Sequence, residues 1–320
     1  MAQVATSTHT GSGPDGPWLS GIIPPVCTPF TADLEVDTVS LERLIGFLIE
    51  EGVSGLFILG SSSEAAYLTD TQRDLVLEVA IKTAAGQVPV LAGAIDMTTG
   101  RMIEHASRAL ALGANAIVAT APFYALVTEP PEVDRHFRVL KSACDAPLIA
   151  YDIPVAVHTK LTASGLVSLA GDHVIDGLKD SSGDLAGMRE VIIGTRSSPQ
   201  FAIFTGSETV VDCVMQMGAS GAVPGLGNVD PKGFVELYNA CRAGQWEQAR
   251  HQQDRLVEVF GVTRCAKPGK GRSASGLGGF KTALMLRGVI STNAMALPQV
   301  ALDNEEIAGV REVLVATGLL

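Results

Sequence analysis

The stretch LALGANAIVATA, residues 110–121, contains the pattern that decides the fold. Its first residues end a segment with apolar side chains three and four positions apart, which is typical of a helix, and Gly113 follows where such a helix would stop. The apolar run 116–121 then has the length of a strand. It shows no polar alternation, which is typical of a strand covered on both faces. The stretch therefore predicts a helix followed directly by a buried parallel strand.

This alternation repeats about eight times before the pattern changes near residue 231. The strand-length runs are 22–28, 55–59, 88–93, 116–121, 147–151, 174–179, 201–205 and 221–224. The helical patterns between them are 38–51, 69–85, 98–112, 130–143, 162–170, 184–194 and 208–217. Such a rhythm predicts an α/β fold of the (β/α)₈ TIM-barrel type. A doubly wound open sheet is the alternative, but no G-x-G-x-x-G follows the first run, and eight units favour closure.

The chain after Pro231 is helical in pattern almost to its end. Segment 231–243 would be the eighth barrel helix, and 246–262, 279–286 and 298–317 would form a C-terminal three-helix extension. Residues 1–17 are rich in Thr, Ser, Gly and Pro and lack the apolar stretch of a secretory signal. We expect a flexible N-terminal extension over 1–17, a barrel over 18–243 and a helical extension over 244–320.

Composition excludes several classes of partner. The formal charge of −11 argues against nucleic acid and against an anionic membrane surface, because both attract clustered cations. The apolar runs are too short to cross a bilayer. The five cysteines stand far apart and show no structural-zinc spacing, which indicates a reduced setting. We therefore predict a cytoplasmic protein.

A lysine ends the sixth strand-length run. Active sites of barrels are built at the carboxyl ends of the strands, so Lys179 would lie at the site and be largely buried. Burial favours the neutral amine, which is the form that attacks a ketone. The alternatives are a lysine that reaches the rim or one that pairs with Asp180, and Lys179 taken alone does not decide between them.

Neighbouring strand ends carry further polar groups. Tyr151 ends the fifth run, where a phenol can carry protons to and from a substrate, although a core tyrosine is the common alternative. The turn 60–64 after the second run is rich in hydroxyls and offers backbone N–H groups that could hold a carboxylate, or it could simply cap a helix. Tyr124 follows the fourth run and adds a second phenol.

Taken together, four motifs resemble those of the dihydrodipicolinate synthase/N-acetylneuraminate lyase family. They are Gly60-Ser61-Ser62-Ser63-Glu64, Pro122-Phe123-Tyr124, Tyr151-Asp152-Ile153-Pro154 and Gly177-Leu178-Lys179-Asp180. The similarity runs from about Gly21 to the C-terminus and includes the segments 25–30 and 225–231. Four separated motifs at expected strand ends are far more specific than any one of them.

The resemblance implies class I chemistry without metal or cofactor, in which Lys179 forms an imine with a 2-keto acid. It implies that Tyr151 handles protons, with Asp152 where Asn is common, and that Ser61 and Ser62 bind the pyruvyl carboxylate, Ser62 also joining the proton relay. Ser63 stands where the family usually has Gly. Tyr124 resembles a relay tyrosine that reaches across a subunit interface, which implies a homodimer or homotetramer.

Two departures from the family bear on the substrate. Synthases of dihydrodipicolinate have an Arg two residues after the Pro of Y-N-x-P, whereas Val155 and Ala156 follow Pro154 here. The resemblance therefore points away from a true dihydrodipicolinate synthase. Sialic acid lyases carry Asp and Glu after the seventh-strand Gly, whereas this chain has Gly206, Ser207 and Glu208.

The acceptor side of the substrate site rests on several candidates. Glu208 could contact a polyol or open the next helix. His158 could take part in acid/base chemistry or be a solvated loop residue. The substrate-binding candidates besides the two serines are Gly206, Ser207, Glu208, Val223 and His158.

These observations predict a lyase that acts on 2-keto acids, most simply by pyruvate-releasing aldol cleavage or condensation of a 2-keto-3-deoxy sugar acid. Dehydration of such an acid begins with the same imine and is the alternative. A catalytically silent barrel that binds a keto acid is a further one. A phosphate-binding barrel is a weaker one, because neither the segment 225–228 nor the basic loop 267–272 forms a complete phosphate motif.

Overall fold

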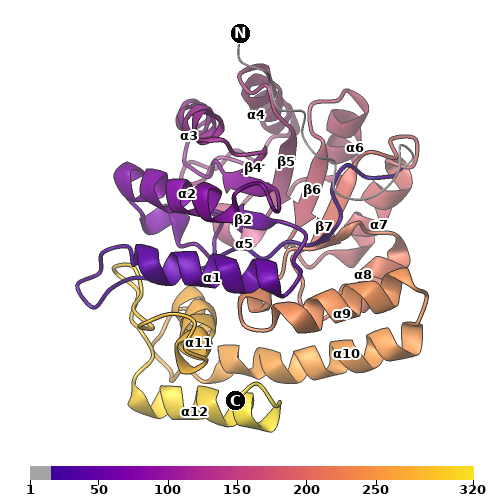
Figure 1. The fold of residues 1–320 in the computed structure, drawn as a ribbon. Coiled ribbons are helices and arrows are strands. Elements are labelled where there is room, and N and C mark those ends of the chain that lie inside the picture. Colours follow the sequence, from indigo (N-terminus) through magenta and orange to yellow (C-terminus); the bar gives the residue numbers. More distant parts are fainter. Residues whose placement is uncertain (1–15) are drawn as a thin grey trace.

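The computed structural model describes residues 16–320, so most of the expected extension 1–17 lies outside the described residues. Its centre is a sheet of eight parallel strands in the order β1-β8-β7-β6-β5-β4-β3-β2 (Figure 1). A parallel bridge from Pro25 to Phe57 joins the two ends of this sheet, and the Phe57 amide donates to the Pro24 carbonyl at 3.0 Å. The expected (β/α)₈ barrel is thereby confirmed. The strands are β1 (Gly21–Ile22), β2 (Leu56–Ile58), β3 (Val90–Gly93), β4 (Ala116–Thr120), β5 (Leu148–Asp152), β6 (Gly177–Asp180), β7 (Ala202–Thr205) and β8 (Gly221–Ala222).

Helices surround the strands. They are α1 (Thr38–Glu50), α2 (Asp70–Ala84), α3 (Thr99–Leu112), α4 (Pro130–Ser142), α6 (Ala163–Gly171), α7 (Leu185–Gly194), α8 (Val211–Met217) and α9 (Pro231–Arg242). Several begin at side-chain caps such as Thr69 and Thr98, whose hydroxyls accept from backbone amides in the first turn. Gly113 is the left-handed C-cap of α3, as expected, and Gly218 has the same role in α8.

Short elements occupy the carboxyl ends of three strands. They are the 3₁₀ helices η1 (Ala65–Tyr67) and η2 (Gly225–Asn228) and the four-residue helix α5 (Pro154–Val157). They follow β2, β8 and β5, respectively, and therefore border the end of the barrel at which active sites are built.

The first strand is much shorter than the predicted run 22–28. Pro24, Pro25 and Pro29 lack the N–H that a continuous ladder needs, so pairing beyond β1 is limited to isolated contacts such as the Pro25 bridge. The helix predicted over 208–217 begins only at Val211. There the amide of Val211 donates to the Gln253 side chain at 2.8 Å, a distant partner that local sequence does not reveal.

The C-terminal extension contains α10 (Trp246–Val259), η3 (Phe260–Arg264), α11 (Arg272–Leu286) and α12 (Asn304–Ala316). It lies beside α8 and α9, at the lower edge of Figure 1. Helix α11 starts seven residues before the predicted 279–286, because Gly276, Gly278 and Gly279 weaken the helical signal. A Cβ on Gly279 would lie 2.3 Å from the carbonyl oxygen of Val262, so the close packing of α11 on η3 requires glycine there.

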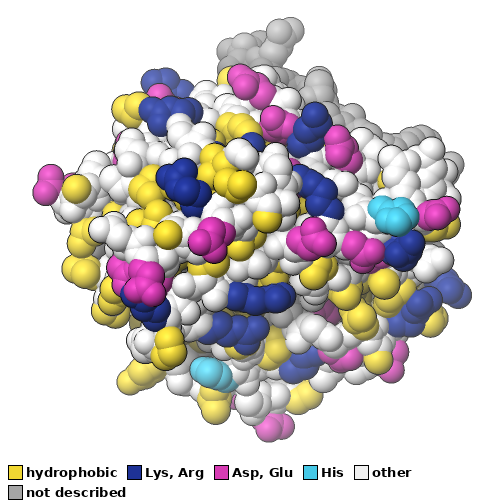
Figure 2. Space-filling view, turned by 90° about the horizontal axis from the view of Figure 1, so that it is seen from below, with side chains coloured by type: hydrophobic (Ala, Val, Ile, Leu, Met, Phe, Trp, Pro, Cys, Tyr) yellow, Lys and Arg dark blue, Asp and Glu magenta, His cyan; other side chains and the backbone are white. Residues whose placement is uncertain are grey.

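The basic loop 267–272 belongs to this extension. Lys267 pairs with Asp303 at 3.1 Å and Lys270 with Glu306 at 2.7 Å, so the loop anchors the start of α12. Figure 2 shows acidic, basic and apolar side chains interspersed over the face seen from below. Among residues 16–320, no helix is both long and apolar enough to span a bilayer.

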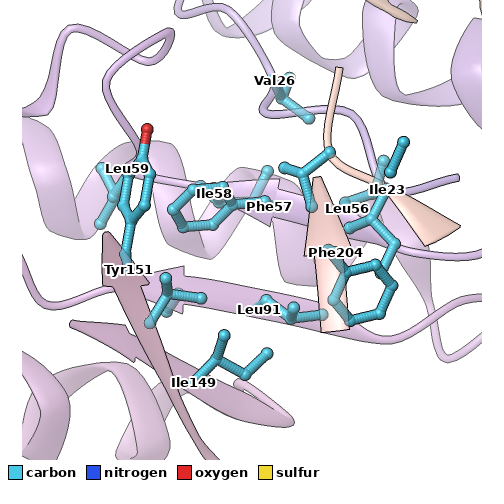
Figure 3. Packing of buried hydrophobic residues seen from close by; sticks show 14 of the residues in the cluster. Ile23, Val26, Leu56, Phe57, Ile58, Leu59, Leu91, Ile149, Tyr151 and Phe204 are labelled. Carbon is cyan, nitrogen blue, oxygen red and sulfur yellow. The ribbon is translucent and has the colours of Figure 1, made fainter. Parts of the chain in front are cut away.

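The core fills the inside of the barrel and the space between strands and helices. Phe57, Phe204 and Ile149 are each at most 1% exposed, and Figure 3 shows them packed across the barrel interior with Leu91. Burying a side chain of this size stabilises a fold by about 1.5–3 kcal/mol. The resulting rigid floor supports the polar residues at the strand ends.

Candidate active site

Lys179 lies on β6 and is only 4% exposed. Its Nζ is 4.7 Å from the centroid of the Phe57 ring and 4.1 Å from that of Tyr151. The suggested partner Asp180 instead accepts hydrogen bonds from the amide and hydroxyl of Ser182, at 2.8 and 2.7 Å. Lys179 therefore neither reaches the rim nor pairs with Asp180, and its amine lies over two aromatic faces.

Tyr151 lies beside Lys179 because β5 and β6 are paired with these two residues in register. It is 3% exposed and packs edge-on against Phe57, with ring centroids 6.1 Å apart. Figure 3 shows its hydroxyl directed away from Ile149 and Leu91 and past the end of the strand. This arrangement places a phenol at the strand end next to the lysine.

Thr120 extends the same layer onto β4, where it is the register partner of Tyr151. Its hydroxyl is buried and has no hydrogen-bond partner among the described residues. A buried unpaired hydroxyl is uncommon in native proteins, so this group is available to a ligand or a water molecule. Sequence reasoning missed Thr120, because it considered the residues after the fourth strand and not the last residue within it.

Gly60 keeps Phe57 in place beneath the lysine. A Cβ at Gly60 would lie 2.6 Å from a ring carbon of Phe57, well inside the contact distance. The turn that follows β2 can therefore pass over the Phe57 ring only with glycine at this position. The sequence identifies this glycine as part of a motif but does not show what it contacts.

The loop 60–64 is a tight turn that presents two of its three serines outward. The amide of Ser63 donates to the Gly60 carbonyl and that of Glu64 to the Ser61 carbonyl, both at 3.1 Å. Ser61 is exposed and Ser62 partly exposed, whereas Ser63 is buried and its hydroxyl donates to the Val26 carbonyl at 2.6 Å. The two outer serines are thus accessible, and the third holds the loop to the segment after β1.

Ser63 fits its position without strain. Its φ is negative, and the left-handed residue of the loop is Glu64, with φ 58°. The Glu64 side chain is buried and forms an ion pair with Lys281 of α11. Sequence reasoning named Glu64 only as part of a motif and missed Lys281, because 217 positions separate the pair.

Glu208 does not open the helix after β7. Its carboxylate accepts a hydrogen bond from the amide of Leu226 in η2, and α8 begins three residues later. Burial raises the pKa of Glu208 to about 7, although the Leu226 hydrogen bond and the charge of Lys179 oppose this shift. Near neutral pH this carboxyl group can therefore hold or release a proton close to the lysine.

The other candidates around β7 and β8 form the backbone frame of the site. The amide of Gly206 donates to the Asp180 carbonyl at 2.7 Å, and that of Ser207 to the Thr205 hydroxyl at 3.0 Å. Val223 is buried, and its amide donates to the Thr205 carbonyl at 2.8 Å. These contacts join the carboxyl ends of β6, β7 and β8.

Asp152 is buried and pairs with Lys160 at 2.5 Å. Burial raises the pKa of the Asp152 carboxyl group, while Lys160 and the amide of Leu161 act in the opposite direction. The pair closes the loop that contains Val155 and Ala156, both exposed and uncharged. His158 ends α5 with φ 59° and an exposed side chain, so the structure leaves its role open.

Tyr124 is separated from the lysine within one chain. It has φ 78° and is 87% exposed, whereas the two rings that face Lys179 belong to Phe57 and Tyr151. Leu126 and Met97 are also exposed, at 61% and 44%. A tyrosine so exposed can contribute to an active site only if its loop moves or a second chain covers it.

Two other sites do not compete with this one. A cavity of about 750 Å³ is lined by Pro89, Asn115 and Pro147, which precede their strands, so it lies at the opposite end of the barrel. The segment Gly225–Asn228 is buried, and the amides of Leu226 and Gly227 already bond to Glu208 and Pro224. It therefore lacks the open amides of a phosphate loop.

Comparisons with known proteins find relatives over nearly the whole chain. The sequence profile described as the dihydrodipicolinate synthetase family matches residues 18–317. An uncharacterised DapA-like lyase of Halobacterium salinarum is 31% identical over 310 residues, which cover 97% of each chain. A 4-hydroxy-tetrahydrodipicolinate synthase of Desulfotalea psychrophila is 31% identical over 89% of this chain and 92% of its own.

Solved structures give the same result. YagE, a prophage protein of the dihydrodipicolinic acid synthase family from E. coli K12, was solved in complex with pyruvate. It superposes with a TM-score of 0.87 at 28% identity, over 94% of this chain and 99% of its own. The dihydrodipicolinate synthase of Bacteroides thetaiotaomicron has a TM-score of 0.87 at 29% identity, over 93% and 98% of the two chains.

Proposed function

The chain belongs to the dihydrodipicolinate synthetase family, and from this premise we propose that it is a lyase in which Lys179 forms a Schiff base with a 2-keto acid. The observation that carries the proposal is the burial of Lys179 over the rings of Phe57 and Tyr151. A lysine amine adds to a ketone in its unprotonated form, and this position holds the amine at the end of the strand where a barrel takes its substrate. The pyruvate complex of YagE supports a keto acid as the substrate class.

The residues around the lysine suit the proton transfers of imine formation. The amine adds to the keto carbon to give a carbinolamine, which must gain a proton on oxygen before water leaves. Tyr151 is the register partner of Lys179, and its hydroxyl points past the strand end, so we assign it this transfer. The loop 60–64 would hold the substrate carboxylate through the backbone amides and the hydroxyls of Ser61 and Ser62, with Ser62 also in the relay.

Aldol cleavage of a 2-keto-3-deoxy sugar acid is the reaction we favour. The bond between C3 and C4 breaks, its electrons move into the protonated imine, and the hydroxyl at C4 loses its proton as the aldehyde forms. Protonation of the resulting enamine and hydrolysis of the imine release pyruvate. Condensation is the same sequence in reverse.

Dehydration is the second candidate, and Glu208 supports it. In this reaction C3 loses a proton and C4 loses its hydroxyl as water, for which a carboxyl group that can donate a proton is useful. Its pKa near 7 gives Glu208 that ability. We place Glu208 with Gly206, Ser207, Val223 and His158 on the acceptor side. The uncharged Val155 and Ala156 favour an acceptor that is not anionic at that position.

We further propose a cytoplasmic homodimer or homotetramer in which Tyr124 of one protomer reaches the site of another. The 87% exposure of Tyr124, together with exposed Leu126 and Met97, supports an interface at this rim. Light scattering after size exclusion would measure the mass of the assembly. A fully active monomer, or a Tyr124→Phe variant that is as active as wild type, would contradict the proposal.

Borohydride reduction in the presence of pyruvate tests the Schiff base directly. The wild-type chain should gain one reduced pyruvyl group, located at Lys179 by peptide mass spectrometry. Lys179→Met should gain none, whereas Lys141→Arg, a change in an ion-paired lysine on α4, should react like wild type. An unmodified Lys179 in the wild-type protein would refute the imine and favour a silent keto-acid-binding barrel.

A panel of 2-keto-3-deoxy acids then separates the two reactions. Each acid is incubated with the enzyme while pyruvate and the dehydrated product are measured in the same sample. Release of pyruvate with an aldehyde in equal amount supports the aldolase. Formation of a dehydrated keto acid without pyruvate would instead show that the enzyme is a dehydratase.

A further inference from the structure

The carboxylate-binding loop 60–64 is held from behind by the C-terminal extension. Glu64 follows the three serines directly, and its carboxylate accepts hydrogen bonds from the amide of Ala296 at 2.8 Å and from the Gln299 side chain at 3.1 Å. Lys281 completes the set through the ion pair. All three partners belong to the extension and lie more than 200 positions away along the chain.

The side chain of Lys281 is fully shielded from water. Its side chain is 0% exposed, its Nζ donates to the Ala294 carbonyl at 2.8 Å, and the Phe30 ring lies 4.3 Å away. Desolvation lowers the pKa of Lys281, and the carboxylate of Glu64 opposes this shift. A charge in such a place persists only while its partner stays near, so the pair fixes Glu64 relative to α11.

The rest of the loop depends on that anchor. Ser61 and Ser62 are at least partly exposed, and their hydroxyls have no side-chain hydrogen bond within the described chain. From the barrel side, Ser63 holds the loop through hydrogen bonds with Val26 and Thr28, at 2.6 and 2.8 Å. Glu64 also carries the left-handed backbone conformation, which must be maintained by its surroundings.

We propose that the Glu64–Lys281 ion pair is a positioning device, through which the C-terminal extension sets the geometry of the substrate carboxylate subsite. The inference rests on the proposed function for the identity of the ligand. Amides that bind a carboxylate must stay within about 0.5 Å and 10–20° of the productive geometry. The ion pair fixes Glu64, the last residue of the turn that carries these amides. The extension is then part of the site and not only a stabilising addition.

Three variants test this role. Lys281→Met leaves the Glu64 carboxylate buried without its cation. Glu64→Gln removes the negative charge, and with it the attraction between residues 64 and 281, while keeping a side chain of the same size. Gln299→Ala is the mild variant, because it removes one donor from a partly exposed residue and leaves the ion pair intact. Lys270→Met is the matched control, since it breaks the buried Lys270–Glu306 pair of the same extension, away from the loop.

The first measurement is hydrogen exchange of the peptide that contains residues 60–64. We expect about tenfold or faster exchange in Lys281→Met, a smaller acceleration in Gln299→Ala and wild-type exchange in Lys270→Met. This readout needs no substrate and so stands even if Lys179 forms no imine. Unchanged exchange of this peptide in both Lys281→Met and Gln299→Ala would overturn the inference.

The second measurement compares pyruvate with pyruvamide, its uncharged amide, as partners in borohydride trapping. The wild type should be half-saturated at a lower concentration of pyruvate than of pyruvamide. In Lys281→Met the ratio of the two half-saturating concentrations, pyruvamide over pyruvate, should fall by roughly tenfold, because the loop no longer presents its donors to the negative charge. Lys270→Met should keep the wild-type ratio. Equal preferences in all variants, with Lys179 trapped normally, would refute the inference and leave the proposed function standing.

Discussion

Lys179 and Tyr151 are register partners on adjacent parallel strands, and the amine of the lysine lies 4.1 Å from the centroid of the tyrosine ring. The ring thus serves as an apolar surface for the amine while its hydroxyl extends past the strand end (Figure 3). One side chain can therefore both position the nucleophile and carry a proton. Replacing Tyr151 with Phe separates the two roles, because it keeps the ring and removes the hydroxyl.

Tyr151→Phe should slow both imine formation and turnover while leaving Lys179 reactive. The ring beneath Lys179 remains, so borohydride trapping of pyruvate should reach the wild-type extent, but more slowly, because the carbinolamine lacks its proton donor. Loss of the proton-transfer group should lower kcat by about 10²–10⁴-fold. Tyr238→Phe, a change on α9 at the opposite end of the barrel, is the control and should be active. Turnover within a few-fold of wild type would show that Tyr151 does not transfer the proton.

Glu208 should make the protein less stable as the pH rises toward neutrality. Its pKa in the folded chain is about 7, above the ordinary 4.5, so folding favours the protonated form. The stabilising contribution of the protonated Glu208 is fully present below about pH 4.5 and is lost as the pH rises through 7. Glu208→Gln removes this dependence and should gain about 1–3 kcal/mol relative to wild type between pH 5 and pH 8.

Urea unfolding of both proteins at several pH values measures this difference. The free energy of unfolding of wild type minus that of Glu208→Gln should fall with rising pH and level off above pH 8. A difference that stays constant, or that rises with pH, would mean that the folded-state pKa is not raised. In that case Glu208 would be a poor proton donor for dehydration.

The sequence predicted the barrel and its central residues because both depend on local signals. The apolar runs, together with a glycine after a helix as at Gly113, predicted the strands in order, and Lys179 and Tyr151 stand at the ends of such runs. Lys281 could not be found this way, because its partner Glu64 lies 217 positions away and the glycines of α11 weaken the helical pattern in the sequence. The hydrogen bond between Glu208 and Leu226 likewise depends on how β7 and η2 meet in space.

Gly60→Ala should displace the aromatic floor of the site. The added Cβ would lie 2.6 Å from the Phe57 ring, so the ring or the loop must move. Overpacking of this kind costs about 1–3 kcal/mol of stability. We expect a lower free energy of unfolding together with at least tenfold slower trapping of pyruvate at Lys179, because Phe57 can no longer lie under the amine.

Gly100→Ala is the matched control for this substitution. Gly100 is exposed on α3, and nothing lies within 4 Å of its added Cβ. Alanine favours a helix over glycine by about 1 kcal/mol, so this variant should be slightly more stable than wild type and trap pyruvate normally. Slower trapping in Gly100→Ala, or normal trapping in Gly60→Ala, would contradict the role assigned to the glycine at the loop.

The buried carboxylate of Asp152 should depend on Lys160 for its stability. The two side chains are 2.5 Å apart, with Asp152 fully buried and Lys160 about one third exposed. Lys160→Met leaves the carboxylate uncompensated and should cost about 1–3 kcal/mol in the free energy of unfolding. Asp152→Asn should cost less, because the amide oxygen still accepts from Leu161 and the freed lysine reaches water.

A double-mutant cycle in urea isolates the interaction between these two residues. In the Asp152→Asn background no buried charge remains, so adding Lys160→Met should change the free energy of unfolding by less than about 0.5 kcal/mol. The coupling energy should therefore be about 1–2 kcal/mol, and it should shrink as the pH is lowered and the carboxylate of Asp152, whose pKa is raised by burial, takes up a proton. Additive effects at pH 7 would mean that Lys160 does not stabilise the loop that follows β5, and that the Leu161 amide alone holds Asp152.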